Sequence, residues 1–319
     1  MLIAQTTPAR RAGFTLVELL IVMVLMSFVA SAIVVLLVRQ QRFYGSASTV
    51  IETRQQIRQA AGILPLDLRG ISSIGGDIYA VTKDSIAFRS TFGTAVLCVN
   101  NQSSSLVYTV PAQLAKGGSA LASWSALPTA NVGNSGADSV AIYDNGPTAM
   151  ANDDLWRRYN ITSVLQVTGA TTCPISTGLV QTADQSKPYY KIGLSPQPTA
   201  TITAGAGMRF FRRVVYKLYQ GSDGQWYLGY YACKTGRTPV CNTIQPLAGP
   251  FQANGVQFSY SDSTGAIIPT PADSATRTKV ALISVVVRGQ AASPVNLTGG
   301  AATVFKDSVR IQVGLRNRM

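Results

Sequence analysis

Residues 9–44 read ARRAGFTLVELLIVMVLMSFVASAIVVLLVRQQRFY, and this stretch determines the fold that we expect for the chain. Its central part, residues 19–38, holds 20 residues without a charge. At about 1.5 Å of rise per residue, a helix of that length spans roughly 30 Å, the thickness of the hydrocarbon layer of a bilayer. The sequence therefore predicts a transmembrane helix over residues 19–38.

Charged side chains on either side of the apolar run indicate its orientation. Arg10 and Arg11 precede it, and positive charge on that side favours a cytoplasmic N-terminus. Arg39 and Arg42 follow the run and weaken this signal. A cleaved secretory signal is the alternative, but the run is too long and no clean small-residue cleavage site follows it. We therefore expect the rest of the chain on the far side of the membrane.

Glu18 is the unusual residue, because it stands at the start of the apolar run. A carboxylate in the apolar part of a membrane helix costs a few kcal/mol unless it is paired. In one interpretation Glu18 lies in the headgroup zone and is merely tolerated. In the other it has a specific cationic partner. The wider sequence context distinguishes the two.

A basic leader, Gly13, Phe14, Thr15, Glu18 and an apolar run follow one another in an order that resembles the prepilin signal of type IV pilins and type II secretion pseudopilins. The resemblance implies that a prepilin peptidase removes a leader of residues 1–13 by cleaving between Gly13 and Phe14. It also implies that Phe14 is then N-methylated. Glu18 would contact the charged N-terminus of a neighbouring subunit.

The same resemblance implies where the chain resides and what it meets. We expect a single-pass protein of the bacterial inner membrane before assembly, and part of a pilus at the cell surface afterwards. Its partners would be the prepilin peptidase, other major and minor pilins, and the inner membrane. Within a bundle of apolar helices, an amine and a carboxylate each neutralise a cost that the other would suffer alone. Pairing would thus favour one axial register.

The helix should continue beyond the membrane as an amphipathic segment. Apolar residues recur there at helical steps, and this face consists of Phe43, Ala47, Val50, Ile57, Ala61 and Leu64. Pro65 disfavours helical geometry at Leu64, so we expect a break or kink there, with at most one more turn before Gly70. The predicted helix covers residues 14–64.

After Gly70 the pattern changes to short apolar runs separated by turn residues, which is typical of β-strands. The predicted strands fall within residues 77–91, 105–110, 138–146, 210–233, 255–265, 279–289 and 305–317. Residues 116–137 are rich in Ala, Ser and Gly and predict surface loops. The expected class is α+β: a pilin-like lollipop whose long helix packs its amphipathic half on a mainly antiparallel domain, residues 65–319.

Looser motifs carry a narrower resemblance. The segments LPLDLRGI, VQFSYSDSTG, TKVALISVVVRG and VRIQVGLRN resemble PilW-like minor pilins and, more distantly, the J-type minor pseudopilins of type II secretion. Major pilins are usually shorter than 319 residues, so the length favours a minor subunit. The alternatives are a minor pseudopilin, a pilus-tip subunit that contacts DNA or a surface, and a plain signal-anchored membrane protein.

Composition argues against catalysis. The chain has no histidine, so Ser-His-Asp, Cys-His and His-based zinc sites are excluded. No phosphate-binding loop or dinucleotide fingerprint follows a predicted strand. We expect no enzyme activity, no cofactor and no metal site. The 27 basic residues against 14 acidic ones give a formal charge of +13, which favours anionic partners.

The four cysteines are Cys98, Cys173, Cys233 and Cys241, and all follow the apolar run. No pair has CxxC spacing, and outside the cytoplasm disulfides are the natural interpretation. Four cysteines allow three connectivities. Cys233 with Cys241 would close a short loop and leave Cys98 with Cys173.

One basic segment is a candidate binding surface. Strand alternation over residues 208–219 places on one face Arg209, Phe211, Arg213, Lys217 and Tyr219. Three cations among aromatic rings suit an anionic polymer such as DNA or a surface polysaccharide. The simpler interpretation is a solvated sheet face whose long side chains cover apolar neighbours.

Overall fold

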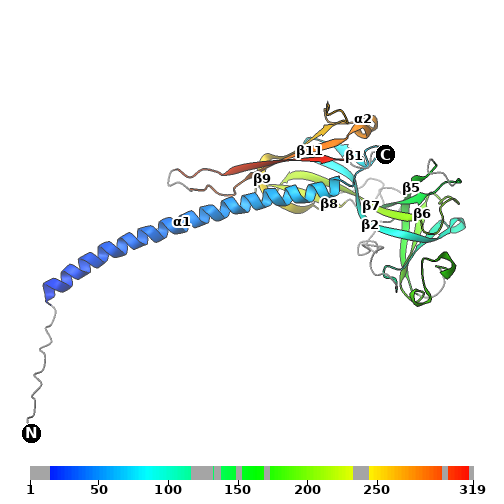
Figure 1. The fold of residues 1–319 in the computed structure, drawn as a ribbon. Coiled ribbons are helices and arrows are strands. Elements are labelled where there is room, and N and C mark those ends of the chain that lie inside the picture. The colour runs from blue at the N-terminus through cyan, green and yellow to red at the C-terminus, as the bar shows by residue number, and fades with distance from the viewer. Residues whose placement is uncertain are drawn as a thin grey trace, which may run out of the picture. The chain divides into compact units, whose positions relative to one another are not determined.

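The structure is a computed structural model that describes residues 15–115, 132, 138–148, 153–168, 173–232, 244–296 and 301–315. One long helix, α1 (Leu16–Leu68), leads into a large antiparallel sheet (Figure 1). This arrangement confirms the expected α+β class. The predicted loop over residues 116–137 lies outside the described residues apart from Val132.

The strands of the sheet are β1 (Ile78–Val81), β2 (Ser85–Asn101), β3 (Leu106–Thr109), β4 (Ser139–Asp144), β5 (Leu155–Val167), β6 (Tyr189–Ser195), β7 (Gly207–Gln220), β8 (Trp226–Ala232), β9 (Ile244–Ser261), β10 (Ile267–Ile268), β11 (Leu282–Gln290) and β12 (Lys306–Gly314). They are hydrogen-bonded in the order β1-β2-β3-β6-β5-β4-β7-β8-β9-β11-β12, with β10 paired to β9 beside this path. A short helix, α2 (Ser274–Lys279), precedes β11. The predicted hairpins β1–β2 and β7–β8 are confirmed.

The additional turn that the sequence allowed after Leu64 is present, but the expected break is not, because α1 continues through Pro65 to Leu68. The carbonyl of Pro65 accepts a hydrogen bond from the N–H of Arg69 at 3.1 Å. Proline removes one hydrogen bond within a helix. Leu64 and Leu68 are both fully buried on the same face, and their burial stabilises the additional turn.

The buried face of α1 differs in detail from the predicted one. Val50, Ile57 and Leu64 are buried as expected. Ala60 is fully buried in place of Ala61, and Phe43 is 49% exposed. Counted back from Leu68 in steps of four, four and three residues, the buried face of α1 passes through Leu64, Ala60 and Ile57. This spacing places Ala60, and not Ala61, in the core.

The chain divides into two compact units, one of residues 1–52 and 291–305, the other of residues 53–290 and 306–319. In the first unit, Val50 of α1 packs with Ala291, Val295 and the half-buried Phe305. The N–H of Asn296 donates to the Ser46 hydroxyl at 3.0 Å. The segment between β11 and β12 therefore packs on the middle of α1.

In the second unit six strands close into a ring that the sequence did not predict. The pairings run β2–β3–β6–β5–β4–β7, and β7 pairs again with β2. Figure 1 shows β2, β5, β6 and β7 gathered in this part of the chain. The ring encloses its own apolar core, which includes Leu97, Ile142, Ile161, Ile192 and Phe210.

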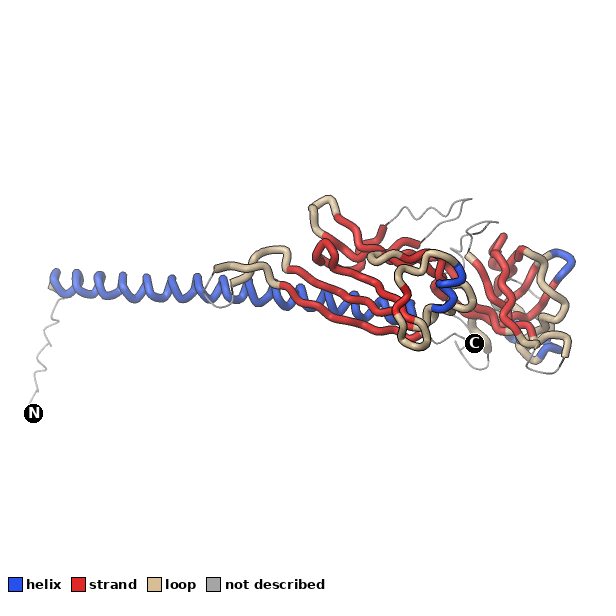
Figure 2. Tube along the Cα trace, turned by 90° about the horizontal axis from the view of Figure 1, so that it is seen from above, coloured by secondary structure: helices blue, strands red, loops and turns tan. Residues whose placement is uncertain are grey.

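The same unit contains a second core where the end of α1 lies along the sheet. Strand β7 extends beyond the ring to pair with β8, and β9, β11 and β12 follow in order. Figure 2 shows the last turns of the helix running beside these strands. Ile57, Leu64 and Leu68 pack there with sheet residues such as Phe88 and Val285. Strands β2 and β7 thus contribute to both cores.

Candidate functional site

The first turn of α1 places Glu18 in a defined position. The N–H of Glu18 donates to the Thr15 hydroxyl at 3.3 Å, and the N–H of Thr15 donates to the Glu18 carboxylate at 3.5 Å. This reciprocal pair is a capping box, in which two orphan donors of a helix start are satisfied. Gly13 and Phe14 lie outside the described residues, so cleavage and methylation remain predictions.

The apolar half of α1 has no cover from the described part of the chain. An 18-residue window of the helix has a mean hydropathy of 3.0, and none of that window is buried. Length and composition are sufficient to cross a membrane. Ser27 and Ser31 donate their hydroxyl hydrogens to the carbonyls of Val24 and Phe28, so the polar side chains of this segment are satisfied within the helix.

Cys98 and Cys173 form a disulfide with a Cα–Cα distance of 5.5 Å. Cys98 comes from β2 and Cys173 from the segment between β5 and β6, and both are buried with Val110 and Val180. This bond realises the expected pairing of these two cysteines. Cys233 and Cys241 lie outside the described residues, and their pairing remains a prediction.

The outward face of β7 carries the predicted basic residues, but neighbouring strands cover much of it. The Arg209 guanidinium lies 4.4 Å from the centre of the Trp156 ring. Phe211 is only 7% exposed and has the Arg158 guanidinium 5.8 Å from its ring centre. The bases of an anionic polymer would have to compete with these arginines for the rings.

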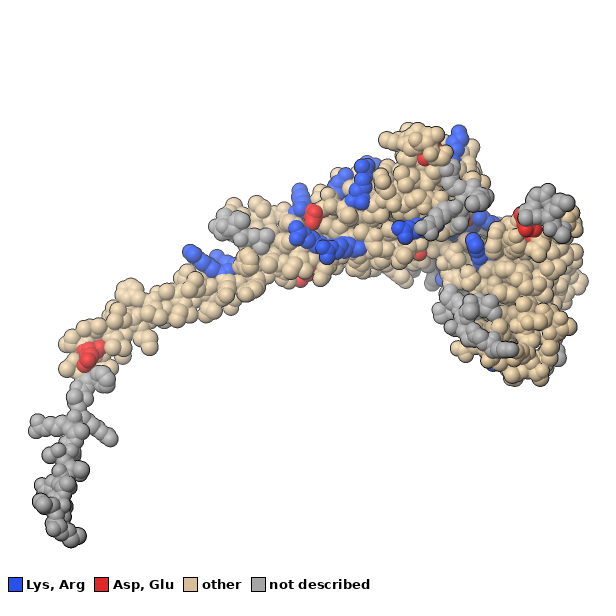
Figure 3. Space-filling view, in the orientation of Figure 1, with Lys and Arg blue, Asp and Glu red and all other residues tan. Residues whose placement is uncertain are grey.

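The other end of the face is more open. Lys217 is exposed, and the Tyr219 ring lies 6.0 Å from that of Tyr227. Arg213 stacks on Tyr79, with 4.5 Å between the guanidinium carbon and the ring centre. On the face drawn in Figure 3, Lys and Arg side chains gather over the β-rich part of the chain, where carboxylates are sparse. Polymer binding along this strand remains a prediction.

The structure brings residues from other elements to Arg213. Tyr79 from β1, Arg89 from β2 and Arg158 from β5 meet Arg213 and the buried Asp77. The Arg158 guanidinium donates to the Asp77 carboxylate at 2.7 Å. Only the register of strands far apart in sequence brings these side chains together. A single-strand pattern carries no signal for such a cluster.

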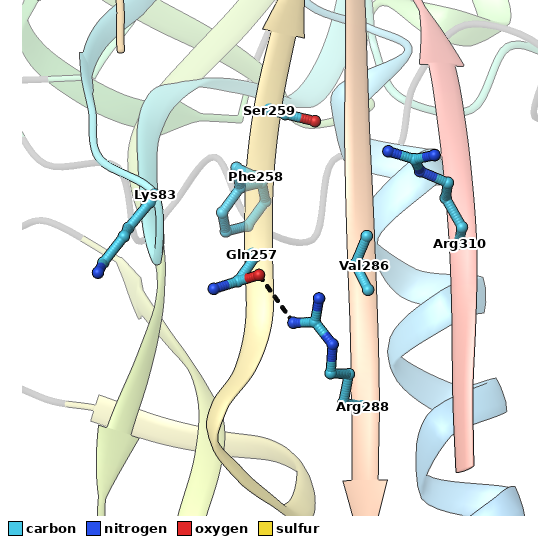
Figure 4. A pocket seen from close by; sticks show the side chains of 7 residues that line it. All are labelled: Lys83, Gln257, Phe258, Ser259, Val286, Arg288 and Arg310. Carbon is cyan, nitrogen blue, oxygen red and sulfur yellow. Dashed lines mark hydrogen bonds between the residues drawn. The ribbon is translucent and has the colours of Figure 1, made fainter. Parts of the chain in front are cut away.

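A shallow depression of about 300 Å³ lies on the other part of the sheet. Figure 4 shows Lys83, Arg288 and Arg310 around it, with Arg288 directed toward Gln257. Arg288 donates to the Gln257 side chain at 2.7 Å and to the carbonyl of Asn254 at 3.0 Å. Both bonds come from one terminal nitrogen of Arg288, and the depression is open to solvent.

Asp144 is a buried carboxylate with a structural role. Arg157, Thr199 and Thr201 all donate to it from their side chains, as does the N–H of Gly146. Burial raises the pKa of Asp144, but these hydrogen bonds to the charged form outweigh burial and hold the pKa below its ordinary value of 3.8. This network ties the end of β4 to β5 and to the segment before β7.

The family described as the prokaryotic N-terminal methylation motif matches residues 8–34. Among curated proteins and among solved structures, none is significantly similar to this chain. The match covers Gly13, Phe14, Glu18 and most of the apolar half of α1. The N-terminal segment is therefore that of a type IV prepilin-like protein. The motif and the apolar helix together are consistent with anchoring in the inner membrane before assembly.

Proposed function

We propose that this chain, whose N-terminal segment is that of a type IV prepilin, is a minor pilin. It enters a pilus, or the complex that primes pilus assembly, as a structural subunit without catalysis of its own. The supporting observation is that the methylation motif of residues 8–34 runs directly into a helix of 53 residues whose end packs on a large antiparallel sheet. The length of 319 residues favours a minor rather than a major subunit.

The proposed maturation begins with cleavage between Gly13 and Phe14 by the prepilin peptidase. The new amine of Phe14 is methylated, and the leader of residues 1–13 is lost. In the assembled bundle the Glu18 carboxylate pairs with the amine of a neighbouring subunit. Each charge offsets the cost of burying the other in an apolar surrounding.

Mass spectrometry of the mature N-terminus, taken from membranes and from sheared filaments, tests this proposal. We expect an N-terminal peptide that begins at methylated Phe14 in both fractions. A Gly13→Val variant, which removes the residue before the scissile bond, serves as the uncleaved control. A chain that keeps residues 1–13 in the wild type, or that never appears among filaments, would refute the assignment.

The motif is shared by pilins and secretion pseudopilins, so a deletion strain separates the two. Loss of surface pili with normal protein secretion supports the minor pilin. Loss of secretion with normal pili contradicts it and identifies a minor pseudopilin.

A further inference from the structure

Two arginines on the second unit face each other across neighbouring strands. Arg89 of β2 and Arg213 of β7 are direct partners in the antiparallel register. Their guanidinium carbons lie 4.8 and 4.5 Å from the centre of the Tyr79 ring. Residues opposite one another in such a pair have neighbouring side chains on one face, and like charges in this position repel. The pair therefore needs negative charge nearby.

The nearby negative charge comes from Asp77, which is 2% exposed and already engaged. One of its oxygens accepts from Arg158 at 2.7 Å and lies 3.6 Å from an Arg89 nitrogen. The other accepts from the N–H of Ser72 at 2.8 Å. In the described part of the chain Arg213 has no ion-pair partner within 4 Å. Arg89 and Arg158 thus share one carboxylate, and Arg213 lies beside them without one among the described residues.

Hydrogen bonding at the pair is also incomplete. The Nε atoms of Arg89 and of Arg213 are both buried, and neither has an acceptor among the described residues. Buried donors in native proteins almost always have a partner, and an unmet donor on a charged group is especially costly. Within the described ranges, Arg213 thus lacks both a counter-charge and an acceptor for its Nε atom. Arg89 shares Asp77 and donates to the Gly76 carbonyl at 3.1 Å, but its Nε atom has no acceptor in the same ranges.

The loop that contains Gly75 keeps Arg158 on Asp77. A Cβ atom at Gly75 would lie 2.8 Å from a terminal nitrogen of Arg158, so glycine allows the loop to close over that side chain. Arg158 is thereby held on Asp77, between the loop and Phe211. Arg89 and Arg213 keep the excess positive charge, and the Arg89 side chain is still 21% exposed.

We propose that Arg89 and Arg213 bind a phosphate-type oxyanion beside Tyr79. A tetrahedral anion presents enough oxygen atoms to accept from two separate guanidinium forks, whereas a carboxylate matches one fork. Stacking on the Tyr79 ring orients both guanidinium groups before the anion binds. This reduces the side-chain entropy that binding must remove. The anion is either free phosphate or the phosphate of an ester. This site is independent of the pilin assignment.

Phosphate titration of the full chain in detergent micelles tests the proposal. The unfolding midpoint is followed at constant pH and ionic strength, with chloride as the replaced anion. We expect a saturable rise with phosphate, because a ligand that binds the folded state stabilises it. Arg89→Gln and Arg213→Gln should each weaken phosphate binding on the order of tenfold. Lys306→Gln, an exposed cation on β12 outside the basic face of β7, is the matched control and should bind as the wild type does.

A second measurement separates binding from a structural role. In phosphate-free buffer Arg213→Gln should unfold no earlier than the wild type, because it removes one of two opposed like charges. Arg213→Lys keeps the charge without the fork and should bind more weakly than the wild type. Glycerol phosphate binding as tightly as inorganic phosphate would identify an ester as the source, and selective binding of the inorganic ion would identify the free anion.

Three results would overturn the proposal. One is the absence of any saturable shift with either phosphate. Another is an equal loss of binding in Lys306→Gln, which would indicate general charge screening. The third is a lowered midpoint of Arg213→Gln that is the same with and without phosphate, since that would make Arg213 a stacking residue only.

Discussion

Gly289 on β11 lies close to Ile57 and Thr53 in the second half of α1. A Cβ atom at this position would lie 2.6 Å from Cδ1 and 2.7 Å from Cγ1 of Ile57, and 3.1 Å from Cγ2 of Thr53. Ile57 is only 4% exposed and has little room to move. Gly289→Ala must therefore displace Ile57 or the helix. Overpacking of this kind lowers the free energy of unfolding by about 1–3 kcal/mol. Because the new atom would strike two atoms of one side chain, we expect a loss of about 2 kcal/mol.

Urea unfolding of the full chain in detergent micelles measures this cost. Trp226 packs against the same core, so its fluorescence reports the loss of helix–sheet packing. The midpoint should fall while the slope stays unchanged. Gly314→Ala on the neighbouring strand β12 is the control, because a Cβ atom there meets nothing within 4 Å. Its effect should remain within about 0.5 kcal/mol.

A double-mutant cycle identifies Ile57 as the cause. Ile57→Ala alone should cost about 2–5 kcal/mol, because it removes a buried side chain. In that background Gly289→Ala should cost at least about 1 kcal/mol less than in the wild type, because the atoms that it strikes are gone. The reasoning is refuted if Gly289→Ala behaves like Gly314→Ala, or if its cost is the same in both backgrounds.

Three other expectations concern the ends and the core of the chain. Glu18→Ala should insert into the membrane normally but be depleted from sheared filaments, as measured by immunoblot; wild-type levels there would contradict the proposed pairing. Replacing both Cys98 and Cys173 by Ser opens a loop with a sequence separation of 75 and should lower the free energy of unfolding by about 4 kcal/mol on a chain-entropy account, which urea unfolding checks. Asp144→Asn should cost about 3 kcal/mol at neutral pH. Folding lowers the pKa of Asp144, so its contribution to the free energy of unfolding is complete above the unfolded pKa of 3.8 and is lost as pH falls through the folded pKa. The difference in free energy of unfolding between wild type and variant should therefore shrink below about pH 4. A difference that stays constant with pH would argue against this role.

The elements predicted correctly are those whose residues alternate or recur clearly. The β7–β8 hairpin is marked by long alternating runs around the turn at Gly221–Gly224. Strands β5 and β6 were missed. In β5 the paired Arg157 and Arg158 interrupt the alternation, and most of its residues are partly or fully exposed. The ring that these strands close depends on pairings between distant segments, which local patterns do not encode.

The basic face of β7 also could be predicted only in part from local alternation. Alternation correctly placed Arg209, Arg213 and Lys217 on one face of β7. It gave no information on Tyr79 and Asp77, which reach that face from other elements. The predicted surface was a row of cations and aromatic rings from one strand, whereas Arg209 and Arg213 stack on rings that come from other strands. Chemistry that depends on which arginine lacks a partner becomes visible only in three dimensions.

The capping box explains how Glu18 can have two roles. Its carboxylate accepts one hydrogen bond from the N–H of Thr15 through a single oxygen, at the long distance of 3.5 Å. A carboxylate has about four acceptor positions, so most remain free for a neighbouring amine. The N-terminal end of the helix dipole also stabilises a negative charge there. The cap holds the charge at the helix start, where an amine of another subunit can reach it, and neither contact excludes the other. Glu18→Gln keeps an acceptor for the cap but loses the charge, so it should preserve the helix start and still fail to assemble.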